Sequence, residues 1–79
     1  MKVLFFGIAR DIVGASELSI SDLIKNPTVN DLKEYLVAKY SDFSKLTSFA
    51  IAVNSEYAKD NVPLERNDEI AIIPPVSGG

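Results

Sequence analysis

The sequence predicts an α+β fold in which strands form one sheet and a single main helix packs against it. Three features carry this prediction: an apolar run over Val3–Ala9, a helix start signal at Thr28, and an apolar run over Ile70–Ile73. Short apolar runs rich in aromatic and β-branched residues are typical of strands that are buried on both faces. We therefore place the first run centrally in the sheet.

The front of the chain predicts a strand, a turn and a second strand. After the strand over Val3–Ala9, Gly14 marks a turn, and Glu17–Ile20 alternates polar with apolar residues. Such alternation predicts a half-buried strand. The two strands would form a hairpin joined by a long loop.

The helix prediction rests on a capping signal and on the spacing of apolar residues. Thr28 stands three residues before Asp31, an arrangement that satisfies free amide groups in the first turn of a helix. Apolar residues then recur at helical spacing on one face, which predicts a helix that ends near Tyr40. These residues are Val29, Leu32, Leu36 and Tyr40.

The second half of the chain predicts three further strands. Phe49–Asn54 alternates large residues with alanines, so the large residues share one face, which we expect to meet the helix. A short strand around Tyr57, a turn at Arg66–Asp68 and a last strand over Ile70–Ile73 follow. Two prolines then end the sheet, because proline cannot donate to a strand ladder. We expect a single domain.

Composition excludes several classes of function. The 79 residues contain no Cys and no His, which removes disulfides, thiol nucleophiles, the commonest general base and the commonest transition-metal ligand, so we expect no metal site. Eight basic residues are spread singly against eleven acidic ones, and with a net charge of −3 we expect no nucleic-acid partner. No segment approaches the ~18 apolar residues of a membrane span. We therefore expect a cytoplasmic protein with no membrane partner.

One helix covers only one face of the predicted sheet, although the first and last strands are apolar on both faces. The uncovered face either stays exposed, as some apolar area does on small domains, or binds a partner. Phe6 and Ile73 are our candidates for that partner interface.

An extended tail over residues 74–79 is the candidate functional segment. Its residues are Pro74, Pro75, Val76, Ser77, Gly78 and Gly79. The prolines would direct it outward, and over roughly 20 Å it could thread a narrow tunnel and present its terminal carboxylate in another protein's active site. A carboxylate is a poor electrophile, so chemistry there needs activation by a nucleotide-using partner. The alternative is that the tail is a frayed end without a function. In that case, deletion of the two glycines would leave the function of the protein intact.

The chain resembles the family of small, sulfur-carrying subunits of molybdopterin synthase, which are ubiquitin-like β-grasp proteins. The resemblance rests on Lys2–Phe6, Arg10, Asp11, Gly14, Val53, Asn54, Glu56, Tyr57 and Asp68–Gly79. The terminal Gly-Gly is shared by all carriers of this kind, whereas the preceding Pro-Pro-Val-Ser is much more specific. One departure is Asn67, where the family often has Gly, but Asn tolerates the same turn conformation. The resemblance implies a β-grasp fold with a mixed sheet of four to five strands packed on one main helix.

The resemblance also implies a mechanism that is centred on Gly79. An adenylating enzyme of the ubiquitin-activating type would use ATP to convert the carboxylate to an acyl adenylate, and a sulfur donor protein would convert that to a thiocarboxylate. The tail would enter the large subunit, where the sulfur attacks a cyclic pyranopterin monophosphate, and two deliveries would make the dithiolene of molybdopterin. The chain would bind no cofactor and would donate sulfur to a catalytic pocket on the large subunit, in a heterotetramer of two small and two large subunits.

Two related functions stay open beside this one. A sulfur carrier for thiamine thiazole synthesis shares the fold and the Gly-Gly end but generally lacks the Pro-Pro segment. A ubiquitin-like protein modifier would instead form an isopeptide bond between Gly79 and a lysine of its target.

Overall fold

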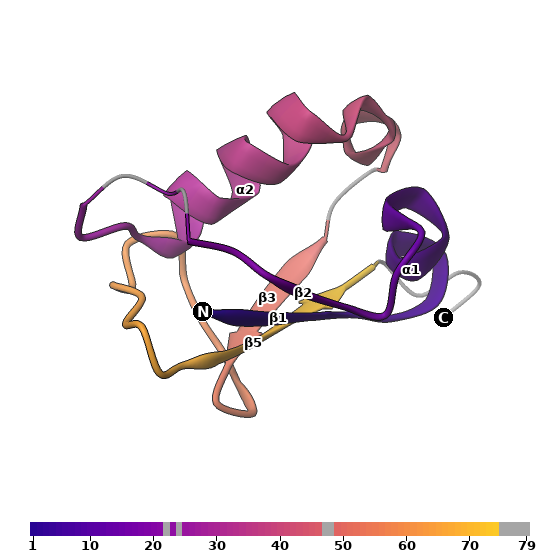
Figure 1. Ribbon diagram of the computed structural model, residues 1–79. Coiled ribbons are helices and arrows are strands. Elements are labelled where there is room, and N and C mark those ends of the chain that lie inside the picture. Colours follow the sequence, from indigo (N-terminus) through magenta and orange to yellow (C-terminus); the bar gives the residue numbers. More distant parts are fainter. Residues whose placement is uncertain (22, 24, 47–48, 75–79) are drawn as a thin grey trace.

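The chain forms one mixed sheet with a long helix across one face (Figure 1). The computed structural model describes residues 1–21, 23, 25–46 and 49–74. In chain order the elements are β1 (Lys2–Phe5), α1 (Gly7–Val13), β2 (Glu17–Ser19), α2 (Val29–Lys39), the 3-10 helix η1 (Ser41–Lys45), β3 (Ala50–Val53), β4 (Glu56–Tyr57) and β5 (Glu69–Ile73). The predicted α+β class and mixed sheet are confirmed.

The first and last strands lie side by side within the sheet. The strand order is β2-β1-β5-β3-β4, and β1 runs parallel to β5 with Phe5 opposite Ile72. The pairs β1–β2, β3–β4 and β3–β5 are antiparallel. The predicted central position of the first strand is therefore confirmed. Because β1 and β5 are parallel neighbours, the segments that follow them leave the sheet at the same end.

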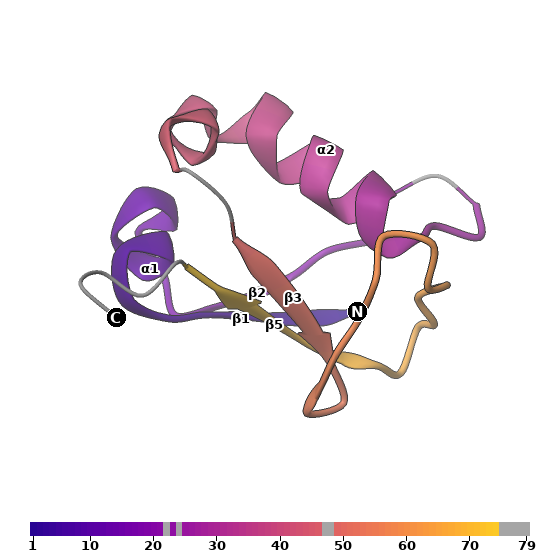
Figure 2. The same cartoon turned by 180° about the vertical axis from the view of Figure 1, so that it is seen from behind.

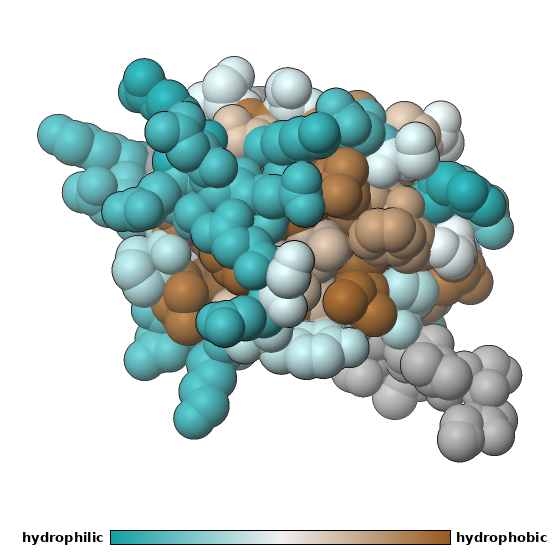
Figure 3. Space-filling model, turned by 90° about the horizontal axis from the view of Figure 1, so that it is seen from below, coloured by the Kyte–Doolittle hydropathy of each residue, from teal (hydrophilic) through white to brown (hydrophobic). Residues whose placement is uncertain are grey.

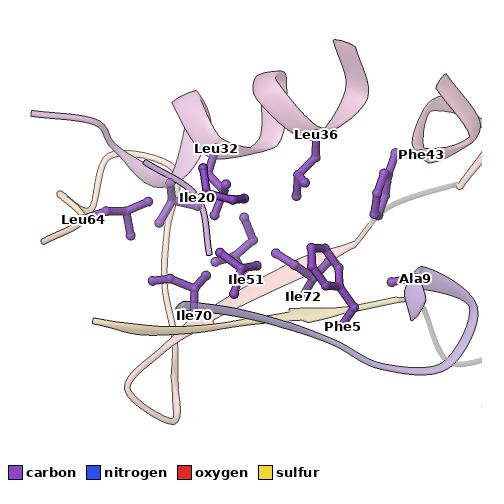
Figure 4. Packing of buried hydrophobic residues seen from close by; sticks show 12 residues of the cluster. Phe5, Ala9, Ile20, Leu32, Leu36, Phe43, Ile51, Leu64, Ile70 and Ile72 are labelled. Atoms are coloured by element: carbon purple, nitrogen blue, oxygen red, sulfur yellow. The ribbon is translucent and has the colours of Figure 1, made fainter. Parts of the chain in front are cut away.

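The hydrophobic core lies between the sheet and α2 (Figure 4). Ile51 and Ile72 are 1% and 0% exposed and point toward the helix, so the large residues of β3 face α2 as predicted. The helix contributes Leu32 and Leu36 to the same layer. The side chains of the sheet and of α2 are thus packed against one another. Because a shift of one residue would turn the buried side chains of a strand to the other face, this packing fixes the register of the sheet.

The capping residues of α2 form the predicted hydrogen bonds. The Thr28 N–H donates to Asp31 Oδ2 at 2.8 Å, and the Asp31 N–H donates to Thr28 Oγ1 at 3.4 Å. At the other end, the Tyr40 N–H donates to the Leu36 carbonyl at 2.8 Å. Both predicted ends of the helix are confirmed, and η1, which the sequence did not predict, follows directly.

The predicted strand over Val3–Ala9 is wrong in its second half. The strand ends at Phe5, and α1 begins at Gly7, whose φ of +53° turns the chain out of the sheet. The helix buries Ala9 completely and ends at Gly14, which has a φ of +81° and donates its N–H to the Arg10 carbonyl at 2.8 Å. The expected long loop of the hairpin is therefore a helix.

The turns of the second half lie where the sequence placed them. Asn54 and Ser55 join β3 to β4 and have φ of 51° and 73°. The turn at Arg66 and Asn67 is present, although Asn67 is not among the described residues with positive φ. No helix in the described part of the chain is long and apolar enough to cross a membrane.

Candidate functional site

The candidate site begins where the chain leaves β5. Ile73 is the last residue of that strand, and Pro74 is a half-buried residue directly after it. The other predicted tail residues lie outside the described part of the chain, and they are Pro75, Val76, Ser77, Gly78 and Gly79. The root of the tail, Ile73–Pro74, is therefore the part of the site whose surroundings the structure describes.

The first turn of α1 lies beside this root. Both cartoon views show α1 next to the end of β5 (Figures 1 and 2), and α1 contacts that strand as well as β1. A Cβ atom built on Gly7 would lie 3.4 Å from Pro74 Cγ, which is van der Waals contact. The parallel pairing of β1 with β5 explains this proximity, because it brings the ends of both strands to the same side of the sheet.

Large apolar side chains are exposed next to the root. Phe6 is 51% exposed and Ile8 is 50% exposed, whereas Ile73 is half-buried. Phe6 and Ile73 are the predicted interface residues, and the structure places both at the end of the sheet where the tail begins. Ile8 was not predicted as an interface residue, because the sequence assigned it to a strand and the structure places it on α1. Its signal was the helical spacing of Ala9, Ile12 and Val13 that follows it.

The face of the sheet away from α2 has an apolar row across its middle. Strand register puts Leu4 opposite Ala71, Ala71 opposite Ala52, and Ala52 opposite Tyr57, which is 75% exposed. Residues opposite one another share a face of the sheet. Figure 3 looks onto this face and shows hydrophobic residues gathered toward the side of α1 and hydrophilic residues toward the other side. The uncovered apolar face that the sequence predicts is therefore present.

One ion pair and one hollow lie away from the tail root. Lys2 Nζ and Glu17 Oε1 are 3.6 Å apart at the start of β1, which is the opposite end of the strand from Phe6. A hollow of about 700 Å³ also lies at that opposite end and includes Met1 and Leu64 in its lining. Within the described residues, no three His, Cys, Asp or Glu side chains converge as a metal site. The root of the tail, Ile73–Pro74, thus lies at the same end of the sheet as the exposed apolar side chains of Phe6 and Ile8.

Sequence comparisons place this chain beside known sulfur carriers. The profile of the ThiS family matches residues 3–79. The molybdopterin synthase sulfur carrier subunit of Caenorhabditis briggsae is 40% identical, over 100% of this chain and 96% of the relative. The protein of the same name from Arabidopsis thaliana is 35% identical, over 100% of this chain and 82% of the relative.

Solved structures give the same fold. A Pyrococcus furiosus protein named for subunit 1 of the molybdopterin converting factor has a TM-score of 0.85, with 27% identity over 95% of both chains. Small archaeal modifier protein 1 from Methanosarcina acetivorans has a TM-score of 0.79, with 28% identity over 99% of this chain and 94% of that one. A chain in the complex of subunits 1 and 2 of the molybdopterin-converting factor from Helicobacter pylori has a TM-score of 0.62, with 30% identity over 99% of this chain and 96% of that one. The β-grasp prediction is confirmed.

Proposed function

The chain belongs to the ThiS family, and on that premise we propose that it is the sulfur carrier subunit of a molybdopterin synthase. The observation that carries this proposal is the full-length match, at 40% identity, to a molybdopterin synthase sulfur carrier subunit. The Pro-Pro-Val-Ser-Gly-Gly sequence that follows β5 supports the same function, because it supplies a slender segment next to an apolar surface.

The reacting group in this proposal is the carboxylate of Gly79. An activating enzyme transfers AMP from ATP to a carboxylate oxygen and releases pyrophosphate, which converts a poor electrophile to a good one. A donor that supplies sulfur at the oxidation level of sulfide then attacks the acyl carbon, so that a carbon–sulfur bond forms, the bond to the AMP oxygen breaks, and a thiocarboxylate is left on Gly79. The chain itself binds neither ATP nor another cofactor in this scheme.

Sulfur transfer follows from the nucleophilicity of the thiocarboxylate. In the large subunit its sulfur forms a bond to a carbon of a cyclic pyranopterin monophosphate while a bond between that carbon and oxygen breaks, so each sulfur replaces one oxygen of the substrate. Water then cleaves the bond between the acyl carbon and sulfur, which returns the Gly79 carboxylate for another round. Two rounds supply the two sulfurs of the dithiolene, and the large subunit provides the groups that bind substrate and move protons.

The partners of this cycle are a large subunit, an adenylyltransferase of the ubiquitin-activating type and a sulfur donor. The H. pylori complex of subunits 1 and 2 supports a large-subunit partner. We assign the contact to Phe6 and Ile73, and to Ile8 in the first turn of α1, because these apolar residues lie at the end of the sheet where the tail begins. Because the cycle depends on ATP, we place it in the cytoplasm.

Intact mass measurement tests the chemistry at Gly79. The chain is incubated with ATP, the activating enzyme and a sulfide source, and we expect one oxygen to be replaced by one sulfur. A variant that lacks Gly78 and Gly79 is the control and should show no replacement. An unchanged mass of the full chain, beside an enzyme that modifies a known carrier, contradicts the proposal.

Reconstitution separates the two sulfur-carrier functions. The thiocarboxylated chain is mixed with a molybdopterin synthase large subunit and pyranopterin precursor, and we expect dithiolene formation with consumption of the thiocarboxylate. A thiamine thiazole carrier would keep its sulfur in this mixture and would release it to the thiazole-forming enzyme instead.

A protein modifier is the second candidate function. The likeness to small archaeal modifier protein 1 from M. acetivorans favours it specifically. In that function the activated Gly79 is attacked by a lysine amine, and AMP leaves as an isopeptide bond forms. Adducts of higher mass that survive denaturation, and that vanish when Gly78 and Gly79 are deleted, would identify this activity.

A further inference from the structure

We propose that Asn54 is a modification site, at which the side-chain amide is lost by intramolecular deamidation, and that Asp68 sets the rate of this reaction. Both residues belong to the part of the sequence that resembles the sulfur carriers, yet the chemistry at Gly79 uses neither of them. The inference goes beyond the proposed function, because it concerns a second reaction at the other end of the sheet from the root of the tail.

The reaction joins a backbone nitrogen to the side-chain amide of the residue before it. The N–H that follows an asparagine loses its proton, the nitrogen attacks the amide carbon, and ammonia leaves as a succinimide ring closes. Water then opens the ring at either carbonyl and leaves aspartate or isoaspartate. The chain therefore exchanges ammonia for water, and no further reactant is needed.

The nitrogen that would attack Asn54 belongs to Ser55. Both residues are exposed in the turn that joins β3 to β4 and projects from the sheet (Figure 1). Ser55 forms no hydrogen bond with the described residues. An N–H without a protein partner reacts without any prior opening of the structure, since no hydrogen bond must break first.

The nitrogens after the other asparagines are less available. These asparagines are Asn26, Asn30, Asn61 and Asn67. The first precedes Pro27, which has no N–H. The third precedes Val62, whose N–H donates to the Lys59 carbonyl at 3.1 Å.

The nitrogens after the remaining two asparagines are also engaged. The Asp31 N–H donates to Thr28 Oγ1 at 3.4 Å in the cap of α2. The Asp68 N–H donates to the Glu65 carbonyl at 3.1 Å. Asn54 is therefore the asparagine whose following N–H has no partner among the described residues.

The side-chain amide of Asn54 is held by two hydrogen bonds. Its Nδ2 donates to Asp68 Oδ1 at 2.9 Å, and its Oδ1 accepts from the Glu69 N–H at 3.0 Å. The Asp68 carboxylate is fixed in turn, because its Oδ2 accepts from the Glu65 N–H at 2.8 Å. Attack by the Ser55 nitrogen makes the planar amide tetrahedral and expels Nδ2, so the bond to Asp68 must break.

The strength of this bond sets the size of the protection. A hydrogen bond to an ionised carboxylate is stronger than one between neutral groups. Its usual net contribution corresponds to a factor of about ten or more in the population of the open form. We therefore expect Asp68 to slow the deamidation of Asn54 at least about tenfold.

The products would weaken the same turn. Aspartate at position 54 has no donor for Asp68 and would place two like charges in contact. Isoaspartate would add a main-chain carbon to the turn between Val53 and Glu56, which are paired across β3 and β4. Both products should therefore lower the stability of the β3–β4 hairpin.

The test compares Asp68→Ala with the matched control Asp42→Ala in the full chain. Asp42 is also a surface carboxylate with a partner, because its Oδ1 lies 3.1 Å from Lys45 Nζ, but it forms no hydrogen bond with a described asparagine. The chains are kept folded in a mildly alkaline buffer. Peptide mass spectrometry then gives the rate of deamidation at each asparagine.

The rates at individual asparagines separate local release from general unfolding. We expect Asn54 to react first in the wild type, and Asp68→Ala to accelerate it at least about tenfold. The other asparagines, and Asn54 in Asp42→Ala, should stay within about twofold of their wild-type rates. The inference is overturned if another asparagine reacts first, if Asp68→Ala leaves Asn54 unchanged, or if that variant accelerates every asparagine equally.

The wild-type chain in urea gives a second measurement that needs no variant. Unfolding removes the hydrogen bonds of Asn54, so its deamidation should be at least about tenfold faster in urea than in the folded chain. Equal rates at Asn54 in the two conditions would show that the fold does not protect it, and the proposed role of Asp68 would be wrong. None of these measurements involves Gly79, so they are decided independently of the sulfur chemistry.

Discussion

Ser55 is the residue in the β3–β4 turn that is least suited to its backbone. Its φ of 73° follows an Asn54 φ of 51°, and two successive positive φ angles define the tight hairpin turn in which Asn-Gly is preferred. Asn54 is held in place because its Oδ1 accepts from the Glu69 N–H at 3.0 Å and its Nδ2 donates to Asp68 Oδ1 at 2.9 Å. Ser55 has no such compensation among the hydrogen bonds of the described residues.

Ser55→Gly should therefore stabilise the fold. We expect the free energy of unfolding to rise by up to about 1 kcal/mol. The steric cost of serine in the left-handed conformation is removed, and this gain exceeds the loss that comes from the greater conformational entropy of glycine in the unfolded chain. Chemical denaturation measures the change. Ser16→Gly is the control, because Ser16 is exposed and is not among the described residues with positive φ, and it should be neutral or destabilising. Equal effects of the two substitutions would contradict the argument from φ.

Thr28 carries the cap of α2, and its replacement has a defined cost. Thr28→Ala removes the acceptor of the Asp31 N–H and one side of the reciprocal pair. We expect the free energy of unfolding to fall by about 1 kcal/mol, whereas Thr28→Ser, which keeps the hydroxyl, should lose much less. Thermal or denaturant unfolding checks both variants, and an equal loss for Ser and Ala would show that the methyl group rather than the hydroxyl matters.

At the scale of elements, local signals predicted α2 and missed α1. The α2 signals are all local in the sequence, because its cap joins Thr28 to Asp31 and its apolar face repeats along one helix. The α1 segment continues an apolar run without a polar break, and periodicity alone cannot distinguish such a run as strand or helix. Gly7 decides where the strand ends, because its positive φ turns the chain out of β1. The turn allows α1 to pack Ala9 into the core, and such a tertiary contact is not visible in the local sequence.

Ala9→Leu tests whether α1 packs as the structure describes. Ala9 is fully buried, so the larger side chain has no space, and we expect a loss of about 1–3 kcal/mol in the free energy of unfolding. Ile8→Leu is the matched control on the same helix, because Ile8 is 50% exposed and should tolerate the change within about 0.5 kcal/mol. Comparable denaturation midpoints for both variants would show that the core has space for a larger side chain at Ala9, which would contradict the described packing of α1.

For the whole molecule, the sequence did not predict which elements surround the root of the tail, and the extended tail itself stays a prediction. The composition of residues 74–79 indicates a slender extended segment without reference to any other part of the chain. The position of α1 beside Pro74 depends instead on the parallel pairing of β1 with β5, which joins residues almost seventy positions apart. Pairing over such a distance leaves no local pattern, so the neighbours of the tail root were not predictable.

Binding to the large subunit should depend on which apolar face is altered. We expect Phe6→Glu to weaken the complex at least about tenfold, because it places a charge at the centre of the proposed contact. Val37→Glu is the control, since Val37 is 37% exposed on α2, which covers the other face of the sheet. Titration calorimetry measures both affinities. Similar losses for the two variants would move the interface away from the tail root.

The parallel pairing of β1 and β5 also ties folding to the progress of synthesis. The first strand made is completed by the last one, so a nascent chain that stops before Glu69 leaves one edge of β1 unpaired and the core without Ile70 and Ile72. Contacts between such distant segments form late in folding. Ribosomes that stall early on this message would therefore release chains that remain open to proteolysis, and the folded population would consist of molecules translated as far as the root of the tail.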